Sequence, residues 1–274
     1  MRILSILDTL EIAPFILGTT STLADRLGCG SVLLLHPAPA SNPDFQSPDE
    51  GMPGPQAQAR FAPSVTAQTT ALHTLCQNWM ATSGHARISH WATGQGDNIR
   101  ALVATEAASA DLVVLSRPRA TDPASVSQAF SGALYDAKAA VVVAPLQSYP
   151  TMGSHPIVAW KASDMLDRAL EHAMPLLEKA ATVTILIGER QAGEEATPTL
   201  AQTLRQKGVA VTLQRFVITS RTEVGEQIRA QALTAGGDLL VMGAYSQPHF
   251  LEWLFGGPTR DILRHGTLPI LTHH

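Results

Sequence analysis

Two segments of this 274-residue chain repeat the same short pattern. The stretch Ala110-Asp-Leu-Val-Val-Leu-Ser116 in the first half matches Gly237-Asp-Leu-Leu-Val-Met-Gly243 in the second half. In each, a small residue and an aspartate precede a run that is apolar almost throughout. Such a run suits a strand that is buried on both faces of a parallel sheet. The repeat therefore predicts a chain whose two halves contain the same order of elements.

Further apolar runs recur through both halves, and helical patterns fall between most of them. In the first half the runs cover residues 3–7, 31–35, 87–91, 111–115 and 140–143, and in the second half 157–160, 182–187, 210–217, 238–242 and 269–271. The clearest helical patterns cover residues 98–108, 163–179 and 222–235. Strands that alternate with helices predict an α/β fold whose parallel sheets are covered on both faces.

The composition of the chain also predicts where it divides into domains. Residues 145–154 are rich in Pro, Ser and Gly and read as a linker, so we expect two domains, residues 1–148 and 149–274. Residues 37–63 are rich in Pro, Gly, Ala, Ser and Gln and have no counterpart in the second half. They predict a long excursion after the second strand, either a lid or a disordered loop.

Composition excludes several classes of protein. Hydrophobic residues make up 45% of the chain, which is ample for a packed core, and the net charge is −4. A nucleic-acid binder usually carries a basic surface, so we expect no nucleic-acid partner. No apolar run is long enough to cross a bilayer, so we expect no membrane partner. Only two cysteines occur, Cys29 and Cys76, and the first residues are too short an apolar run for a signal peptide. These features predict a cytoplasmic protein.

The second half ends in a turn that suits an anion. Residues 237–246 read as a buried strand followed by a polar turn, and residues 255–265 read as a helix that opens at Gly256 and Gly257. A strand that ends in Gly243 brings bare backbone to the carboxyl edge of the sheet. The helix start directs unsatisfied N–H groups and a positive dipole end into the same space. Such a place favours phosphate.

Over nearly its full length, the chain resembles a tandem universal stress protein of the UspA superfamily. The phosphate-binding pattern of that family is Gly, two residues, Gly, nine residues, Gly, then Ser or Thr. Gly243 and Gly256 match its first and third glycines. Ser246 replaces the second glycine and Gly257 replaces the hydroxyl residue, with Thr259 close by.

The same resemblance implies an architecture. Each half would form a doubly wound, five-stranded parallel sheet of strand order 3-2-1-4-5, and the two halves would pair as an internal pseudo-dimer. The last strands, near residues 141–143 and 270–271, would meet at the contact between the domains. A homodimer is the other assembly that we expect.

The two halves differ at their implied nucleotide sites. In the second half Lys161 stands where the family usually has an Asp that meets the nucleotide, and Trp160 and Gly188 complete the implied set. The first half keeps the acidic residue as Asp8, but Ser116-Arg117-Pro118 replaces the first glycine region. The resemblance thus implies a weakened ATP or AMP site in the second half and a degenerate site in the first. Magnesium is expected only as a companion of the nucleotide.

Nothing in the sequence pairs a nucleophile with a base. It contains neither a P-loop nor a Gly-x-Ser-x-Gly elbow, so we expect a non-catalytic protein with at most weak ATP hydrolysis. His73 and Cys76 are spaced to share a helix face, but two such ligands are more often packing residues than a metal site. Asp97, Asp111 and Asp238 follow small residues at strand or helix starts, where we expect them to act as caps.

Two other functions compete with this interpretation. The first is an interaction module of the same fold that acts through its surface and residues 37–63. The second is an enzyme of the adenine-nucleotide α-hydrolase group. That enzyme would need a pyrophosphate loop after the first strand, and neither residues 8–10 nor residues 161–163 supply one.

Overall fold

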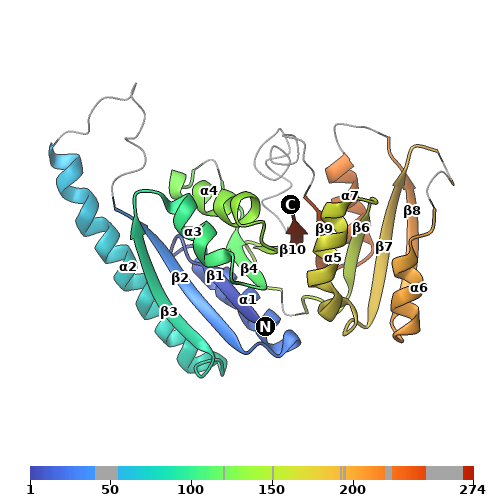
Figure 1. Ribbon diagram of the computed structural model, residues 1–274, viewed down its shortest axis with the longest axis horizontal. Coiled ribbons are helices and arrows are strands. Elements are labelled where there is room, and N and C mark those ends of the chain that lie inside the picture. The colour runs from blue at the N-terminus through green and yellow to red at the C-terminus, as the bar shows by residue number, and fades with distance from the viewer. Residues whose placement is uncertain are drawn as a thin grey trace. The chain divides into compact units, whose positions relative to one another are not determined.

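The computed structural model of the protein describes residues 1–40, 55–119, 121–149, 151–191, 193, 196–219, 224–244 and 268–274 (Figure 1). The chain divides into two compact units, Met1–Ala139 and Ala140–His274. The strands follow the hydrogen-bonding order β3-β2-β1-β4-β5-β10-β9-β6-β7-β8. None of the described helices is both long enough and apolar enough to cross a membrane.

The first unit alternates strands and helices from its first residues. Its elements are β1 (Arg2–Ile6), α1 (Ala13–Leu27), β2 (Ser31–Pro39), α2 (Pro55–Ser83), β3 (Ser89–Gly96), α3 (Ile99–Ala107), β4 (Leu112–Ser116), α4 (Ala124–Ser131) and a π-helix (Gly132–Asp136). Strand β1 pairs in parallel with both β2 and β4, and β2 pairs in parallel with β3. The strand order therefore reverses direction beside β1.

Burial explains why most of β1 is apolar. Ile3, Leu4 and Ile6 have no exposed surface, since α1 contacts one face of the strand and neighbouring strands flank it. The one polar residue within this run, Ser5, is also buried and shares a hydrogen bond of 2.7 Å between its Oγ and Thr20 Oγ1 of α1. Its hydroxyl is therefore satisfied inside the core.

The second unit repeats the alternation. Its elements are β5 (Val141–Ala144), β6 (Pro156–Trp160), α5 (Asp164–Leu177), β7 (Thr182–Glu189), α6 (Thr199–Gln206), β8 (Ala210–Val217), α7 (Val224–Thr234), β9 (Leu239–Gly243) and β10 (Ile270–His273). Strand β6 pairs in parallel with β7 and β9, β7 pairs with β8, and β10 pairs in parallel with β9.

The predicted order 3-2-1-4-5 is confirmed for the first five strands, but the sheet continues beyond them. Strand β5 pairs antiparallel with β10, with Val142 opposite Leu271. The prediction that these two strands meet is confirmed. The second half repeats the same order as β8-β7-β6-β9-β10, and the two sets of five strands belong to one ten-stranded sheet, where a sheet for each half was expected.

Helix starts follow local signals in the sequence. Asn98 Oδ1 accepts a hydrogen bond of 2.9 Å from the N–H of Ala101 at the start of α3, and Ser163 Oγ accepts one of 3.3 Å from Leu166 at the start of α5. These N-caps satisfy backbone donors that have no partner within the helix. The helices predicted from residues 98 and 163 therefore begin where expected.

The predicted excursion over residues 37–63 needs correction. Residues 37–39 are the end of β2, and residues 55–63 begin α2, while residues 41–54 lie outside the described structure. Strand β3 also runs past its predicted end to Gly96. Gly94 lies within this strand. A Cβ at this position would lie 2.8 Å from Leu102 Cδ1, so glycine lets α3 pack closely against the strand.

Candidate functional site

The predicted nucleotide site of the second unit lies at the carboxyl edge of its sheet. Strand β6 has β7 on one side and β9 on the other, so the strand order reverses beside it, and ligands of doubly wound sheets bind at such a point. Trp160 ends β6 opposite Ile187, so Gly188 follows at the same edge. Continuing the β6–β9 register by two residues brings Trp160 beside Gly243.

Four predicted residues therefore share this edge. Trp160 is half-buried, Lys161 is exposed, Gly188 is half-buried and Gly243 is buried. The other four predicted residues, Ser246, Gly256, Gly257 and Thr259, lie outside the described part of the chain.

Gly243 has a packing role. A Cβ at this position would lie 2.7 Å from the backbone N of Leu166 and 3.0 Å from the carbonyl carbon of Met165. The first turn of α5 thus rests directly on the end of β9, and only glycine leaves room for it. Gly188 also makes room for neighbours, since its Cβ would lie 3.1 Å from Phe216 Cζ. Packing alone accounts for both glycines.

The start of α5 already has its own partners. Ser163 caps its first turn, and Asp164 and Asp167 place negative charge where the helix dipole is positive. The positive end of the dipole of α5 is therefore already balanced by acidic side chains of the same helix.

A buried ion pair at the same edge was missed by sequence reasoning. Glu189 ends β7 with its side chain 3% exposed, and it pairs with Arg215 of β8. Its Oε2 also accepts a hydrogen bond of 2.9 Å from the N–H of Gly193. The signal was a carboxylate two residues after the apolar run 182–187, with an arginine inside the neighbouring run 210–217.

In the first unit the retained acidic residue is deeply buried. Asp8 lies two residues beyond β1 and is 7% exposed. Burial, and to a smaller extent the negative charge of Asp122, raise its pKa from 3.8 to about 7. Its Oδ1 has no hydrogen-bond partner among the described residues. Gln68 of α2 donates to the backbone carbonyl of Asp8 and helps to hold this segment.

Two arginines, Arg117 and Arg119, follow β4 in the first unit. Burial lowers the pKa of Arg117, and the neighbouring Arg119 lowers it as well. Hydrogen bonds to Glu11 and Asp122 raise the pKa of Arg119. Sequence reasoning noted Arg117 only as a replacement for glycine and did not identify Arg119 or Asp122. The spacing of Arg119 and Asp122, three residues apart in a polar turn, is the signal that would have found them.

Comparison with known proteins agrees with this architecture. No protein-family model and no curated protein sequence matches the chain. A universal stress protein from Archaeoglobus fulgidus DSM 4304 superposes with a TM-score of 0.70 at 15% identity, over 98% of this chain and 94% of that one. This chain has the universal stress protein fold.

Two weaker likenesses also come from universal stress proteins. A putative one from Pseudomonas aeruginosa UCBPP-PA14 has a TM-score of 0.45 at 14% identity, over 98% of this chain and 91% of that one. The Archaeoglobus fulgidus protein in complex with dAMP has a TM-score of 0.27 at 15% identity, over 42% of this chain and 93% of that one. At these TM-scores neither likeness adds to the fold assignment.

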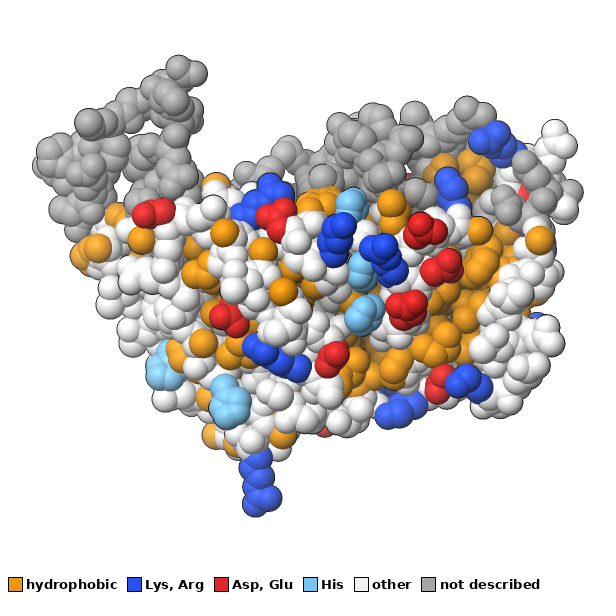
Figure 2. Space-filling model, in the orientation of Figure 1, with side chains coloured by type: hydrophobic (Ala, Val, Ile, Leu, Met, Phe, Trp, Pro, Cys, Tyr) orange, Lys and Arg blue, Asp and Glu red, His pale blue; other side chains and the backbone are white. Residues whose placement is uncertain are grey.

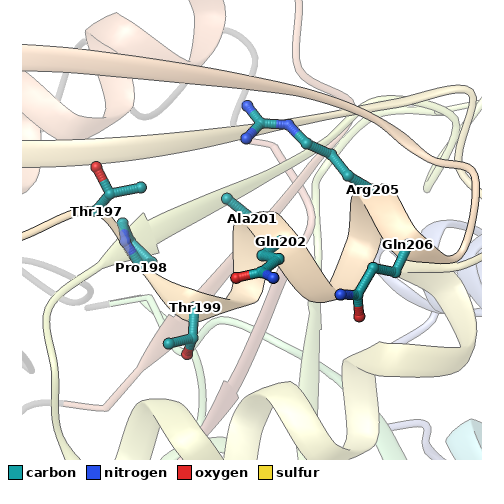
Figure 3. A pocket seen from close by; sticks show the side chains of 7 residues that line it. All are labelled: Thr197, Pro198, Thr199, Ala201, Gln202, Arg205 and Gln206. Carbon is teal, nitrogen blue, oxygen red and sulfur yellow. The ribbon is translucent and has the colours of Figure 1, made fainter.

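On this universal stress protein fold, the surface features of the described residues do not indicate a second site. A hollow along α6 is lined mainly by polar side chains and by none of the predicted site residues (Figure 3): Thr197, Pro198, Thr199, Ala201, Gln202, Arg205 and Gln206. Acidic and basic side chains are interspersed over the face shown in Figure 2. Among the described residues, no three His, Cys, Asp or Glu side chains gather to hold a metal ion.

His73 and Cys76, which share a face of α2, are accounted for by packing. The ring of His73 stacks on Trp91 of β3 with 5.3 Å between ring centroids. The Cys76 side chain is fully buried, and burial raises the pKa of its thiol to about 12. A thiol that stays protonated is a poor metal ligand.

Proposed function

We propose that this protein is a non-catalytic universal stress protein with a weakened adenine-nucleotide site in its second unit. The observation that supports this most is the position of Trp160 and Lys161, which leave the sheet where its strand order reverses. The fold likeness to a universal stress protein supports the class but not the ligand.

Each residue of the proposed site has a chemical role. Trp160 offers an aromatic face to an adenine ring, and Lys161 offers a positive charge to a phosphate group. Backbone N–H groups of residues 256–259 cradle the phosphate, with Thr259 supplying a hydroxyl. The resemblance assigns Ser246 and Gly257 to the same site, and Gly188 and Gly243 keep the strand ends free of side chains. Lys161 in place of an acidic residue is the reason to expect weak binding.

We also propose that the chain consists of two related domains, residues 1–148 and 149–274, which pair as a pseudo-dimer in the cytoplasm. The repeated aspartate supports their relationship. Asp111 accepts a hydrogen bond from the N–H of Arg2 at the start of β1, and Asp238 accepts one from His155 just before β6. Both cysteines are free and buried, as suits a reducing compartment.

Calorimetric titration with ATP and with AMP tests the nucleotide site. We expect binding by the unaltered protein and at least about tenfold weaker binding by Gly256→Val, which crowds the proposed phosphate turn. Lys161→Ala should also weaken ATP binding and reduce its salt dependence, because it removes a charge that faces phosphate.

The control is Lys179→Ala. Lys179 follows the end of α5, at the opposite edge of the sheet from Lys161, so its removal should leave affinity unchanged. A thermal melt shows that each variant is folded. Unaltered protein that binds neither nucleotide would overturn the site and favour the interaction module that acts through its surface.

A further inference from the structure

Two histidine rings join the last strand of the second unit to α5. The rings of His172 on α5 and His273 at the end of β10 stack with 5.8 Å between their centroids and 19° between their planes. His273 is 6% exposed, and His172 is half-buried. We call these two residues the His172–His273 stack. It holds the last residue of β10 against the helix.

The backbone of His273 in turn holds the chain just after β9. Its carbonyl oxygen accepts a hydrogen bond of 2.9 Å from the N–H of Ala244, and its Cα lies opposite that of Gly243. This bond lies at the carboxyl end of the pairing between β9 and β10. The ends of a paired strand open more readily than its centre. A movement of His273 away from α5 therefore acts first on Ala244.

The hydrogen bond of the His273 ring determines where this ring takes up a proton. Its Nδ1 lies 2.9 Å from the carbonyl oxygen of His274, and Nδ1 carries the hydrogen because a carbonyl oxygen can only accept. The lone pair of the neutral ring is therefore on Nε2, and acid adds the second proton there.

The surroundings of His273 oppose this second proton. Burial lowers its pKa most, the hydrogen bond to the carbonyl of His274 raises it in part, and positive charge on His172, Arg168 and His274 lowers it again. Strands β5 and β9, which flank β10, contain no charged residue. The carboxylates on α5 are those of Asp164, Asp167 and Glu171. An imidazolium that is buried beside positive side chains is costly, and water relieves both the burial and the repulsion.

We propose that the His172–His273 stack is an acid-sensitive contact, which holds the end of β10 against α5 while His273 is neutral and opens when this ring becomes charged. Opening moves the imidazolium into water and away from Arg168 and His172. It also weakens the hydrogen bond between Ala244 and His273. The contact belongs to the strand end, so the proposal does not depend on the nucleotide site proposed for the same unit.

Linkage sets the pH range of this response. The pKa of His273 lies below its ordinary value of 6.5 while the contact is closed, and it returns toward that value in water. The open contact therefore binds a proton that the closed contact lacks. Closure is strongest above about pH 6.5 and weakens as the pH falls below this value. Asp8 in the first unit responds in the opposite direction, so the contact needs a local measurement.

Amide hydrogen exchange of Ala244 is this local measurement, because its N–H is bonded to His273. We expect its protection factor, corrected for the intrinsic pH dependence of exchange, to be at least about threefold lower at pH 5 than at pH 7.5. The internal reference is the N–H of Leu240, which is bonded to the Pro269 carbonyl at the other end of the same pairing and should keep its protection. Equal protection of Ala244 at both pH values would overturn the proposal. An equal loss at Ala244 and Leu240 would do so too, since acid would then loosen the whole strand.

Two variants separate this contact from other effects of acid. Glutamine is uncharged at every pH, and its amide can still donate to the carbonyl of His274, so His273→Gln should abolish the pH difference at Ala244. His90 is exposed on β3 of the first unit, so His90→Gln should retain this difference. A pH difference that persists in His273→Gln would show that another group is responsible and would end the proposal.

A further measurement needs no variant. In an NMR titration of the unaltered protein, the ring signals of His273 and the amide signal of Ala244 should change with one common midpoint below pH 6.5. An Ala244 signal that stays constant while His273 titrates would contradict the coupling between the ring and the strand end.

Discussion

Asp238 accepts a hydrogen bond of 3.0 Å from the backbone N–H of His155, one residue before β6 begins. The same carboxylate also accepts hydrogen bonds from the N–H groups of Gly153 and Ser154, at 3.0 and 2.8 Å. In the first unit Asp111 makes the corresponding contact with Arg2, at 2.6 Å. Each aspartate therefore caps the start of a neighbouring strand, β1 or β6, and not of the strand that it precedes, and the second copy makes more bonds than the first.

This difference predicts that removal of the two carboxylates lowers the free energy of unfolding by unequal amounts. Asp238→Ala should lower the free energy of unfolding by about 2–4 kcal/mol, because three backbone donors lose a buried, charged acceptor. Asp111→Ala should cost less than about 1 kcal/mol, since its side chain is 53% exposed and water can replace it. Urea denaturation followed by circular dichroism compares the two. Similar midpoints for both variants would contradict this interpretation.

Gly132 should tolerate no side chain. A Cβ there would lie 2.2 Å from the carbonyl oxygen of Arg100, so Gly132→Ala has to push α3 away from the π-helix. We expect a loss of about 1–3 kcal/mol or more. Gly18→Ala is the matched control, because its Cβ meets nothing within 4 Å and alanine favours a helix by about 0.5–1 kcal/mol. Thermal melts should therefore shift in opposite directions for the two variants.

The buried Asp8 predicts a pH dependence of stability. Its pKa is raised to about 7 from 3.8, so the native state holds a proton that the unfolded chain has released. The free energy of unfolding should fall by up to about 1.4 kcal/mol per pH unit between pH 4 and 7. Asp8→Asn should remove this slope and be more stable than the unaltered protein at pH 8. Asp164→Asn, at an exposed position of α5, controls for the loss of a formal charge. Melting temperatures of Asp8→Asn that track the unaltered protein across this range would refute the prediction.

Cys76 should resist thiol reagents in the folded protein. Its side chain is fully buried and burial raises its pKa to about 12, so little thiolate forms at pH 8. We expect labelling at least about a thousandfold slower than for a free cysteine, from the thiolate fraction alone. Mass spectrometry of protein treated with iodoacetamide, with and without urea, measures this. Rapid labelling of native protein at Cys76 would show that the contact between α2 and the sheet opens readily.

Much of the fold was predictable because its buried strands consist mainly of apolar residues. Runs such as residues 3–7 and 111–115 contain one polar residue each among four apolar ones, and they supply most of strands β1 and β4. Helices α3 and α5 were predictable from their capping residues and apolar spacing. The extension of β3 through Gly94 and Gly96 was missed because these glycines resemble a turn until the packing of α3 against them is known.

Much less of the site was predictable. Trp160, Lys161, Gly188 and Gly243 were placed at one sheet edge by resemblance, and the structure brings them to one edge. The sequence does not reveal that α5 presses on Gly243 or that Glu189 and Arg215 pair beside it. It also hides the burial of Asp8 and the ion pair between Glu11 and Arg119, two residues more than a hundred positions apart.

The antiparallel pairing of β5 with β10 has a consequence for synthesis. Strand β5 leaves the ribosome long before β10, yet β10 is the neighbour that completes its second edge within the unit Ala140–His274. Until then Val141, Val142 and Val143 form a short apolar edge that can pair with other strands. Translation that stalls between the two strands would therefore leave the nascent chain prone to aggregation at the exposed edge of β5. We expect a chaperone to be needed at this edge.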